Sequence, residues 1–502
     1  RRSETRRSET LGACYTPLQN VSSSIVRTGG TFAARQRGSP VSVGVSVGRA
    51  SAGAEPVETR SLPPMTERVA AVILSAGMGT RMKSSLPKVL HPVAGKPMIA
   101  WVLDTVAEAG ADPVVVVTAP AHDRVREAVR SRAALAVQDP PLGTGHAVLA
   151  SAEVLEDWCA GGGTVLVCFG DTPLITPQTL SRLVAARRTP DDPAVVVLGF
   201  EPADPALYGR LITGPDHSLE RIVEARDATP YELEVGLCNG GVMAIDAALL
   251  FDMLRQVGNA NAKGEYYLTD LVGIARERGR RCAVVTCDPV ETQGVDSRAG
   301  LARAEAAMQN RLRAAAMDGG VTMTAPETVF LTHDTRLGQD VTVAPHVVFG
   351  PKVVVESGAE IRAFSHLEGA VVGAGAQVGP YARLRPGARI GENAHIGNFV
   401  EVKNAEVETG AKANHLSYIG DARIGSGANI GAGTITCNYD GFNKFHTDIG
   451  AGAFIGSNTA LVAPVTVGDG AVIGAGSTVT RNVAGDDLVV VRGETKTIPG
   501  GG

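Results

Sequence analysis

The spacing of apolar residues divides the chain into two patterns. In the first, short β-branched runs such as VAAVIL from Val69 and AVVVLGF at 194–200 alternate with helix-like segments such as MIAWVLDTVAEAG. Two further runs, at 113–119 and 165–170, extend this alternation. Runs of this kind are typical of buried parallel strands, so the first pattern predicts an α/β sheet of Rossmann-like type.

In the second pattern, an aliphatic residue recurs every six positions. Such a period is the signature of a left-handed parallel β-helix, in which each turn of chain stacks an inward side chain on its neighbours. The period is interrupted between about 402 and 449, where we expect loops to leave the rigid scaffold and build a site. The two periodic runs are Val372, Val378, Leu384, Ile390, Ile396 and Val402, and then Ile449, Ile455, Leu461, Val467, Ile473 and Val479.

Between the two patterns lies a segment rich in Ala, Leu and Arg. Asp296 or Ser297 can cap its N-terminus, and Gly319-Gly320 can end it, so we predict a helical linker. The sequence therefore predicts an α/β domain at 66–295, a linker at 296–320 and a β-helix domain at 321–502.

Residues 1–65 differ from both patterns. They begin with the tandem RRSETRRSET, are rich in Arg, Ser, Gly and Val, and lack an apolar helical period, so we expect disorder. The segment resembles a basic targeting peptide, yet it contains Glu4, Glu9, Glu55 and Glu58, which such peptides avoid. A start assigned upstream of the true Met65 is the alternative interpretation.

Composition and charge narrow the function classes. The 47 basic and 52 acidic residues leave a net charge of −5, which gives no overall attraction to nucleic acid or membrane. No apolar run reaches the roughly 18 residues of a membrane span, so no membrane insertion is expected. A disulfide framework or a zinc site is not expected either, because the cysteines are scattered and odd in number. They are Cys14, Cys159, Cys168, Cys238, Cys282, Cys287 and Cys437.

A glycine-rich loop, SAGMGTRM, follows the first apolar run. Its backbone N–H groups can approach an anion because glycine lacks a Cβ, and Arg81 and Lys88 add positive charge. Such a loop alone is equally a plain turn, and both cations could be solvated surface groups.

The longer segment LSAGMGTRMKSSLPK at 74–88 resembles the signature of the sugar-phosphate nucleotidyltransferase family. The resemblance implies that Leu74, Gly77 and Arg81 contact a bound UTP, and that Lys88 stabilises charge at the reacting phosphorus. It also implies a uracil-binding segment, although Asp139-Pro140-Pro141 departs from the family's usual sequence there. The uracil contacts would be Gln138, Gly143 and Thr144.

Asp171, in FGDTPL, follows a predicted strand, at the edge where open α/β sheets bind ligands. A carboxylate there can hold Mg²⁺, and the resemblance implies Asn261, in NANAKGEYYLTD, as its partner ligand. The same resemblance implies that N-acetylglucosamine-1-phosphate is bound by Gly209, Glu224, Asn239 and Asn261. The alternative for Glu224 is a surface acid.

In the second half, YARLRPGA, ANHLSYIGD and ANIGAGTITCNYDGFNK resemble the acetyltransferase half of the bifunctional uridylyltransferase/acetyltransferase family that makes UDP-N-acetylglucosamine. The resemblance implies that His415 is the general base, a task that its ordinary pKa suits; the alternative is a packed histidine in a turn. The implied contacts to glucosamine-1-phosphate are Arg385, Lys403, Tyr418 and Asn429. Those to acetyl-CoA are Asn438, Tyr439, Lys444, Ser457, Ala475 and Arg492.

Together these resemblances imply a cytoplasmic homotrimer. It would transfer an acetyl group from acetyl-CoA to glucosamine-1-phosphate, and then a uridylyl group from UTP to N-acetylglucosamine-1-phosphate, for cell-envelope polysaccharides. Because Ser457, Ala475 and Arg492 are far from His415 in sequence, we expect the acetylation site to lie between subunits.

Two other classes of protein also combine a nucleotidyltransferase domain with a β-helix. A nucleotidyltransferase with one activity could use the β-helix only for assembly, but ANHLSY with its histidine opposes that interpretation. A regulatory subunit of a translation factor could also have this layout, but Arg81 and Asp171 oppose it, because such lineages tend to lose these residues.

Overall fold

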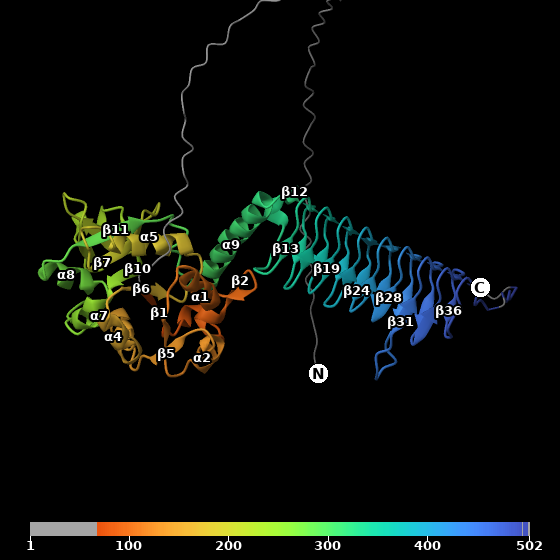
Figure 1. Ribbon diagram of the computed structural model, residues 1–502, viewed down its shortest axis with the longest axis horizontal. Helices are drawn as coiled ribbons and strands as arrows, with labels where there is room; N and C mark the ends of the chain where they lie inside the picture. Colours follow the sequence, from red (N-terminus) through yellow and green to blue (C-terminus); the bar gives the residue numbers. More distant parts are fainter. Residues whose placement is uncertain (1–67, 494, 500–502) are drawn as a thin grey trace, which may run out of the picture. The chain divides into compact units, whose positions relative to one another are not determined.

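A computed structural model of the chain describes residues 68–493 and 495–499. The disorder predicted for residues 1–65 and the residue Cys14 lie outside the described part. That part contains an α/β domain, a long helix and a stack of coils (Figure 1). None of its helices is long and apolar enough to cross a bilayer.

The α/β domain is built on a mixed sheet. Its strands are β1 (Val69–Ser75), β4 (Val114–Thr118), β5 (Ala134–Val137), β6 (Thr164–Phe169), β7 (Val195–Phe200), β8 (Arg210–Thr213), β9 (Leu219–Val223), β10 (Cys238–Asp246) and β11 (Cys282–Thr286). The main order is β11-β7-β10-β6-β1-β4-β5, with β8 and β9 attached beside β10. The predicted α/β sheet is confirmed, but β10 runs antiparallel to both β6 and β7.

Helices cover both faces of this sheet (Figure 1). Every residue of β1 is buried, because its side chains alternate between the two helical layers. One layer consists of α1 (Met98–Glu108), α2 (Asp123–Val129) and α5 (Pro177–Arg187). The other consists of α3 (Thr144–Leu149), α4 (Ala152–Ala160), α7 (Ala247–Leu254) and α8 (Asp270–Glu277). The remaining short elements are β2 (Pro92–Val93), β3 (Lys96–Pro97) and α6 (Pro230–Leu233).

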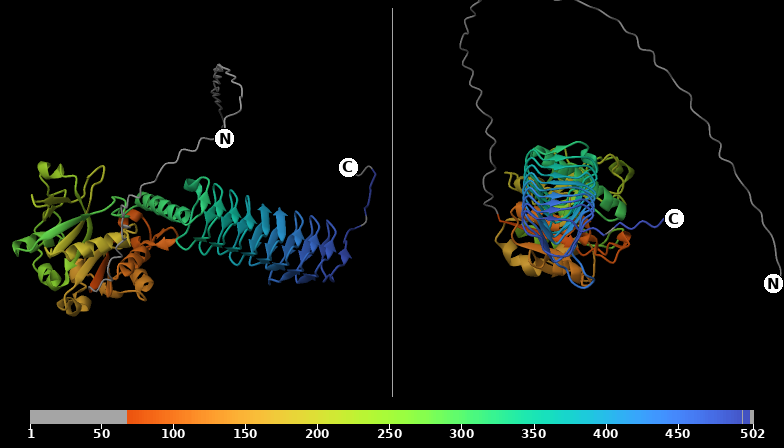
Figure 2. Two further views of the ribbon diagram at one scale, coloured as in Figure 1. Left: turned by 45° about the horizontal axis from the view of Figure 1, so that its top comes forward. Right: turned by 90° about the vertical axis from the view of Figure 1, so that its right-hand side faces the viewer.

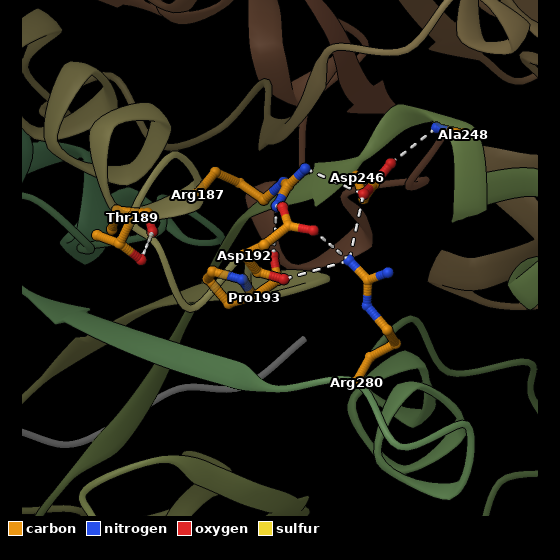
Figure 3. A network of polar contacts seen from close by, with 8 residues as sticks. Arg187, Thr189, Asp192, Pro193, Asp246, Ala248 and Arg280 are labelled. Atoms are coloured by element: carbon orange, nitrogen blue, oxygen red, sulfur yellow. Dashed lines mark hydrogen bonds and ion pairs between the residues drawn. The ribbon is translucent and has the colours of Figure 1, made fainter.

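A buried arginine ties several of these elements together (Figure 3). Arg187, at the end of α5, donates to Asp192 at 2.6 Å and to Asp246 at 3.0 Å. Asp246 also caps α7 by accepting from the N–H of Ala248, and Arg280 donates to Asp192 from the opposite side. The hydrogen bond from Arg187 holds the pKa of Asp192 below its ordinary value.

Helix α9 (Arg298–Asp318) follows the α/β domain, and the predicted helix is confirmed. Its N-cap is Ser297 rather than Asp296, since the Ser297 hydroxyl accepts from the N–H of Gly300 at 3.2 Å. In the C-terminal half of the helix, the Gln309 amide donates to the carbonyl oxygen of Leu331 at 2.6 Å and accepts from the N–H of Leu331 at 2.9 Å. This attaches the helix to the first coil; the domain limits at 295 and 320 stay a prediction.

The coils form three parallel sheets, the architecture of a left-handed parallel β-helix, stacked along a common axis (Figure 2). Face 1 consists of β12 (Thr322–Met323), β14 (Thr342–Val343), β17 (Glu360–Ile361), β20 (Gln377–Val378), β23 (His395–Asn398), β26 (Lys412–His415), β29 (Asn429–Ile430), β32 (Phe454–Ile455), β35 (Val472–Ile473) and β37 (Leu488–Val489). Face 2 consists of β15 (Val348–Phe349), β18 (His366–Leu367), β21 (Arg383–Leu384), β24 (Glu401–Lys403), β27 (Tyr418–Gly420), β30 (Ile435–Cys437), β33 (Ala460–Val462) and β36 (Thr478–Val479). Face 3 consists of β13 (Arg336–Leu337), β16 (Val354–Val355), β19 (Val371–Val372), β22 (Arg389–Ile390), β25 (Glu406–Val407), β28 (Ala422–Ile424), β31 (Thr447–Ile449) and β34 (Val465–Val467).

All twelve aliphatic residues of the six-residue period are buried, as predicted. The interruption between 402 and 449 is not a general departure from the scaffold, and in this the expectation was wrong. Coils continue through it, with one side shortened to five residues between Val402 and Val407 and again between Ile419 and Ile424. Within this interval, the described chain leaves the coils as a longer loop only at residues 438–446, so most of the predicted acetyltransferase residues lie on rigid coils.

Candidate functional site

A cavity of about 270 Å³ opens beside the C-terminal ends of β1 and β6; we call it the first cavity. The family resemblance predicts a set of UTP contacts, and all of them except Arg81 line this cavity. The predicted metal ligand Asp171 lines it as well. Its lining residues are Leu74, Ser75, Ala76, Gly77, Lys88, Val89, Gln138, Pro141, Gly143, Thr144, Ala147, Phe169, Asp171 and Glu265.

Lys88 and Asp171 form an ion pair in the wall of this cavity. Their side chains are only 17% and 18% exposed, so each charge depends on a partner in the protein or in a ligand. The glycine loop packs on the lysine: Gly79 has φ +59°, and a Cβ there would lie 2.7 Å from the Cβ of Lys88. An anion entering the cavity therefore meets a cation that is already positioned.

Arg81 lies outside the first cavity. Its side chain is 74% exposed and pairs with Asp296 at 2.6 Å, so its predicted contact with the triphosphate stays a prediction. Asp296 itself is close to the metal-ligand candidate, because the N–H of the preceding residue, Val295, donates to the carbonyl oxygen of Asp171 at 2.9 Å. Sequence reasoning considered Asp296 only as a helix cap and missed this position.

Hydrogen bonds within the predicted uracil-binding segment fix the side chain of Gln138. Gln138 is buried, and its amide N–H groups face the carbonyl oxygen of Gly143 at 2.9 Å and Nδ1 of His146 at 3.2 Å. The side-chain oxygen is therefore the group left for a ligand. Gly143 has φ +113°, and a Cβ there would lie 2.6 Å from the Tyr266 carbonyl oxygen, so this close approach requires glycine.

A second cavity, of about 150 Å³, shares Thr144, Phe169 and Glu265 with the first. It contains two predicted sugar contacts, Glu224 and Asn239. Burial raises the pKa of Glu224, and the charge of Lys263 opposes that effect. The full lining is Thr144, Phe169, Glu224, Asn239, Gly241, Met243, Lys263, Glu265, Tyr267, Leu268 and Thr269.

Two other predicted sugar contacts do not line either cavity. Gly209 is nevertheless near, since a Cβ there would lie 3.6 Å from Oε1 of Glu224. Asn261 stabilises its own loop: its amide donates to the Glu265 carbonyl oxygen at 2.5 Å, and its oxygen accepts from the N–H groups of Lys263 and Glu265. Lys263, Glu265 and Tyr267 were missed, although the matched run NANAKGEYYLTD contains all three.

His415 ends β26, at the turn from face 1 to face 2. Its Nδ1 is 2.9 Å from Oδ1 of Asn398, its partner on β23, and the imidazole is exposed. Because an amide oxygen only accepts, Nδ1 carries the proton, and Nε2 keeps a lone pair for a substrate proton. Asn398 was missed, because nothing in its local sequence marks it.

The same turn carries the predicted CoA contacts in later coils; we call this column, with Asn398, the His415 corner. Gly476 N–H donates to the Ser457 carbonyl oxygen at 2.8 Å, and Arg492 Nε donates to that of Ala475 at 3.2 Å. With coils about 4.8 Å apart, His415 and Ala475 are roughly 15 Å apart on one chain. Their separation in sequence is therefore no reason to place them on different subunits.

The predicted phosphate-binding cations lie elsewhere, at the turn from face 2 to face 3. This cationic corner consists of Arg385, Lys403, Asn438, Tyr439 and Lys444. Lys403 is 3.5 Å from Asp421, and a hydrogen bond with Lys403 lowers the pKa of Lys444.

The two remaining predicted sugar contacts begin strands on the flat faces, and the Tyr418 side chain extends toward this corner, since a Cβ on Gly420, the residue before Asp421, would collide with the Tyr418 hydroxyl. Tyr418 begins β27 on face 2, and Asn429 begins β29 on face 1. Face 2 thus separates the base candidate from the cations within one chain.

The fold and these sites define a nucleotidyltransferase domain joined to a hexapeptide-repeat transferase domain. Residues 71–228 match the MobA-like NTP transferase domain, and residues 369–404 and 446–481 match the bacterial transferase hexapeptide (six repeats). "Bifunctional protein GlmU" of Paramagnetospirillum magneticum is 58% identical over 87% of this chain and 96% of its own, and that of Rhodospirillum rubrum is 60% identical over 86% and 96%.

A solved structure of UDP-glucose pyrophosphorylase complexed with UDP-glucose aligns with 49% of this chain and 99% of its own. The sequence identity is 18% and the TM-score is 0.39. The chain belongs to the GlmU family of bifunctional proteins. It is a uridylyltransferase followed by an acetyltransferase, and it makes UDP-N-acetylglucosamine from nucleotide, sugar-phosphate and acetyl-CoA substrates.

Proposed function

We propose that the first cavity binds UTP and that the second binds N-acetylglucosamine-1-phosphate. The observation that supports this most directly is the wall that the cavities share, Thr144, Phe169 and Glu265. Two adjoining cavities bring two substrates together without a covalent enzyme intermediate.

In this proposal, a phosphate oxygen of the sugar phosphate attacks the α-phosphorus of UTP. One P–O bond forms, the bond to the β-phosphate oxygen breaks, and pyrophosphate leaves. The nucleophile is already an anion, so no general base is required. The protein's part is to position the substrates and neutralise charge, for which the partly buried ammonium of Lys88 is placed.

We propose Mg²⁺ as the divalent metal of this half. Among the described residues, no group of three or more His, Cys, Asp or Glu side chains could hold a metal alone. Mg²⁺ commonly takes one or two carboxylates and completes its coordination with phosphates and water, and Asp171 fits that role. Asn261 stays the predicted second ligand; its side-chain amide is engaged in its own loop, and the carboxylate of Asp296, which lies near Asp171, is engaged with Arg81. Bound there, the ion would neutralise charge on the triphosphate.

For the second activity, we propose that His415 accepts a proton from the glucosamine amine. The amine nitrogen forms a bond to the thioester carbonyl carbon, the C–S bond breaks, and the proton taken by Nε2 passes to the CoA thiolate. Asn438 donates to the carbonyl oxygen as it gains negative charge. Arg385, Lys403 and Lys444 hold the phosphate of glucosamine-1-phosphate, and Ser457, Ala475 and Arg492 hold CoA.

We propose a homotrimer in which the His415 corner of one subunit meets the cationic corner of the next. The support is that one chain separates these two halves of the chemistry by the width of face 2. A head-to-tail contact of two different surfaces closes into a ring, and three subunits suit a three-sided coil. A location in the cytoplasm stays a prediction.

The test is a split assay on the purified protein. Thiol release from acetyl-CoA with glucosamine-1-phosphate reports one activity, and pyrophosphate release from UTP with N-acetylglucosamine-1-phosphate and Mg²⁺ reports the other. His415→Ala should abolish only the first, and Asp171→Ala only the second. Loss of both activities in either folded variant would refute the assignment of the two sites.

A further inference from the structure

Asp421 lies at the centre of the cationic corner, in contact with Lys403 and Asn438. It occupies the turn between β27 and β28, and its side chain is 13% exposed. One carboxylate oxygen accepts from Asn404 at 2.6 Å. The other accepts from the amide of Asn438 and lies 3.5 Å from Nζ of Lys403.

We propose that Asp421 is a positioning residue of the acetyltransferase, which fixes the Asn438 amide and the Lys403 ammonium relative to each other. The inference rests on the proposed function, because Asn438 and Lys403 are the groups assigned there to the thioester and to the sugar phosphate. Asp421 touches neither substrate in this scheme and acts through these two side chains.

The chemistry of an amide explains why a carboxylate is needed. Asn438 has two N–H bonds, and Asp421 accepts one of them, which turns the amide nitrogen toward the carboxylate and leaves the second N–H for the thioester oxygen. A carboxylate cannot donate a hydrogen bond, so it holds an N–H rather than the oxygen of the amide toward itself. Without this hydrogen bond, the Asn438 side chain could present either its amide nitrogen or its amide oxygen to the thioester.

The charge balance of the corner points the same way. Lys403 shares a hydrogen bond with Lys444, which raises the pKa of Lys403, and the attraction of Asp421 adds to that effect. Arg385 has its own counter-ion in Glu401 at 2.8 Å. Asp421 is therefore the carboxylate that holds the Lys403 ammonium beside the amine of Lys444 before a phosphate arrives.

A purely structural role is the competing explanation, since Asp421 has φ +48° and turns in this region favour Asn or Asp. Asp421→Asn separates the two. It keeps the size, the turn preference and one acceptor for Asn404, but it has a single acceptor oxygen and no charge. A matched control is Asp340→Asn, at φ +60° in an early coil away from this corner.

We expect Asp421→Asn to keep the melting temperature and the uridylyl transfer of the wild type. Its kcat for acetyl transfer should fall roughly 10- to 100-fold, with KM for acetyl-CoA changed by no more than about twofold, because a donor needed in the transition state is lost. Asn438→Ala should cause a similar fall in kcat, and the double variant should have the same kcat as Asn438→Ala alone, because the part of Asp421 that acts through Lys403 changes KM for glucosamine-1-phosphate. Asp340→Asn should change neither activity.

Each result decides between the proposals. Full acetyl transfer by Asp421→Asn, or effects that multiply in the double variant, would overturn the role of Asp421 while leaving the proposed function intact. A wild type without thiol release would overturn the proposed function itself. An Asn438→Ala variant with full activity would remove the group through which Asp421 is said to act, and the inference with it.

Discussion

Asn398 and His415 lie side by side on adjacent strands of face 1, with Oδ1 of Asn398 2.9 Å from Nδ1 of His415. Both residues lie on rigid coils. The pairing of adjacent strands therefore holds the Asn398 amide against the His415 imidazole and fixes the orientation of the ring. A hydrogen bond at one ring nitrogen decides which nitrogen can act as a base.

Asn398→Ala should therefore lower kcat for acetyl transfer, by roughly tenfold, because the imidazole loses its orientation and preferred tautomer while its basicity remains. Asn398→Asp keeps an acceptor, and its charge favours the protonated imidazole, so the acid limb of the pH–rate profile should move to higher pH. Thiol release measured between about pH 5 and 9 checks both variants. An unchanged profile in both would show that Asn398 does not orient the base.

Gly397 offers a backbone test of the same relationship. A Cβ at this position would lie 1.9 Å from the carbonyl oxygen of Asn414, the residue before His415, so any side chain must displace that strand. Gly397→Ala should reduce acetyl transfer severely and leave uridylyl transfer at the wild-type rate. Gly273→Ala, where nothing lies within 4 Å of the added Cβ, is the matched control and should change neither rate.

Glu224 is expected to trade stability for sugar binding. Burial raises its pKa, so the folded protein binds this proton more tightly than the unfolded chain does. Its contribution to stability is therefore greatest below the ordinary carboxyl pKa of about 4.3 and is lost as pH rises through the raised value. Glu224→Gln should raise KM for N-acetylglucosamine-1-phosphate and, at neutral pH, leave the free energy of unfolding unchanged or slightly higher. A marked loss of stability at neutral pH would contradict this account.

The Arg187 network predicts a specific asymmetry in stability. Asp246→Ala leaves a buried guanidinium short of a partner and removes the cap of α7, and should cost about 3–5 kcal/mol. Arg187→Met removes the charge and keeps the apolar stem, so its cost should be smaller. Both tryptophans, Trp101 and Trp158, lie in the α/β domain, so fluorescence during urea unfolding reports on this domain and, through the contact of Trp101 with His333, on its junction with the first coil. Equal costs for the two variants would argue against an uncompensated charge.

What could be predicted from the sequence depends on how local the signal is. The aliphatic period and the loop after β1 are local, and both led to the correct fold and to the first cavity. Asn398 and Asp421 could not be found in this way, because their roles depend on which residue stacks on which in the next coil. The shortened side between Val402 and Val407 places His415 17 positions after Asn398 rather than 18, a spacing that a strict six-residue period does not give. Arg81 shows that a motif does not reveal where a side chain points: it pairs with Asp296, and its contact with the triphosphate stays a prediction.

The separation of the two corners predicts complementation between inactive variants. His415→Ala lacks the proposed base, and Lys403→Ala lacks a proposed phosphate-binding cation of the proposed trimer, so each alone should show little acetyl transfer. In a mixed trimer, each site takes His415 from one subunit and Lys403 from its neighbour. A site is intact when the first subunit is the Lys403→Ala variant, which keeps His415, and the second is the His415→Ala variant, which keeps Lys403. Random assembly of equal amounts makes that combination at about one interface in four.

Co-refolding the two variants should therefore restore roughly a quarter of the wild-type rate, whereas mixing the folded trimers without exchange should restore none. Uridylyl transfer, which uses one chain, should stay at the wild-type level in every sample and serves as the internal control. If both defects instead lay in a site built by one chain, no mixture would recover activity, because every chain would contain a damaged site. Recovery thus distinguishes a shared acetylation site from one in which face 2 is bridged within a single subunit.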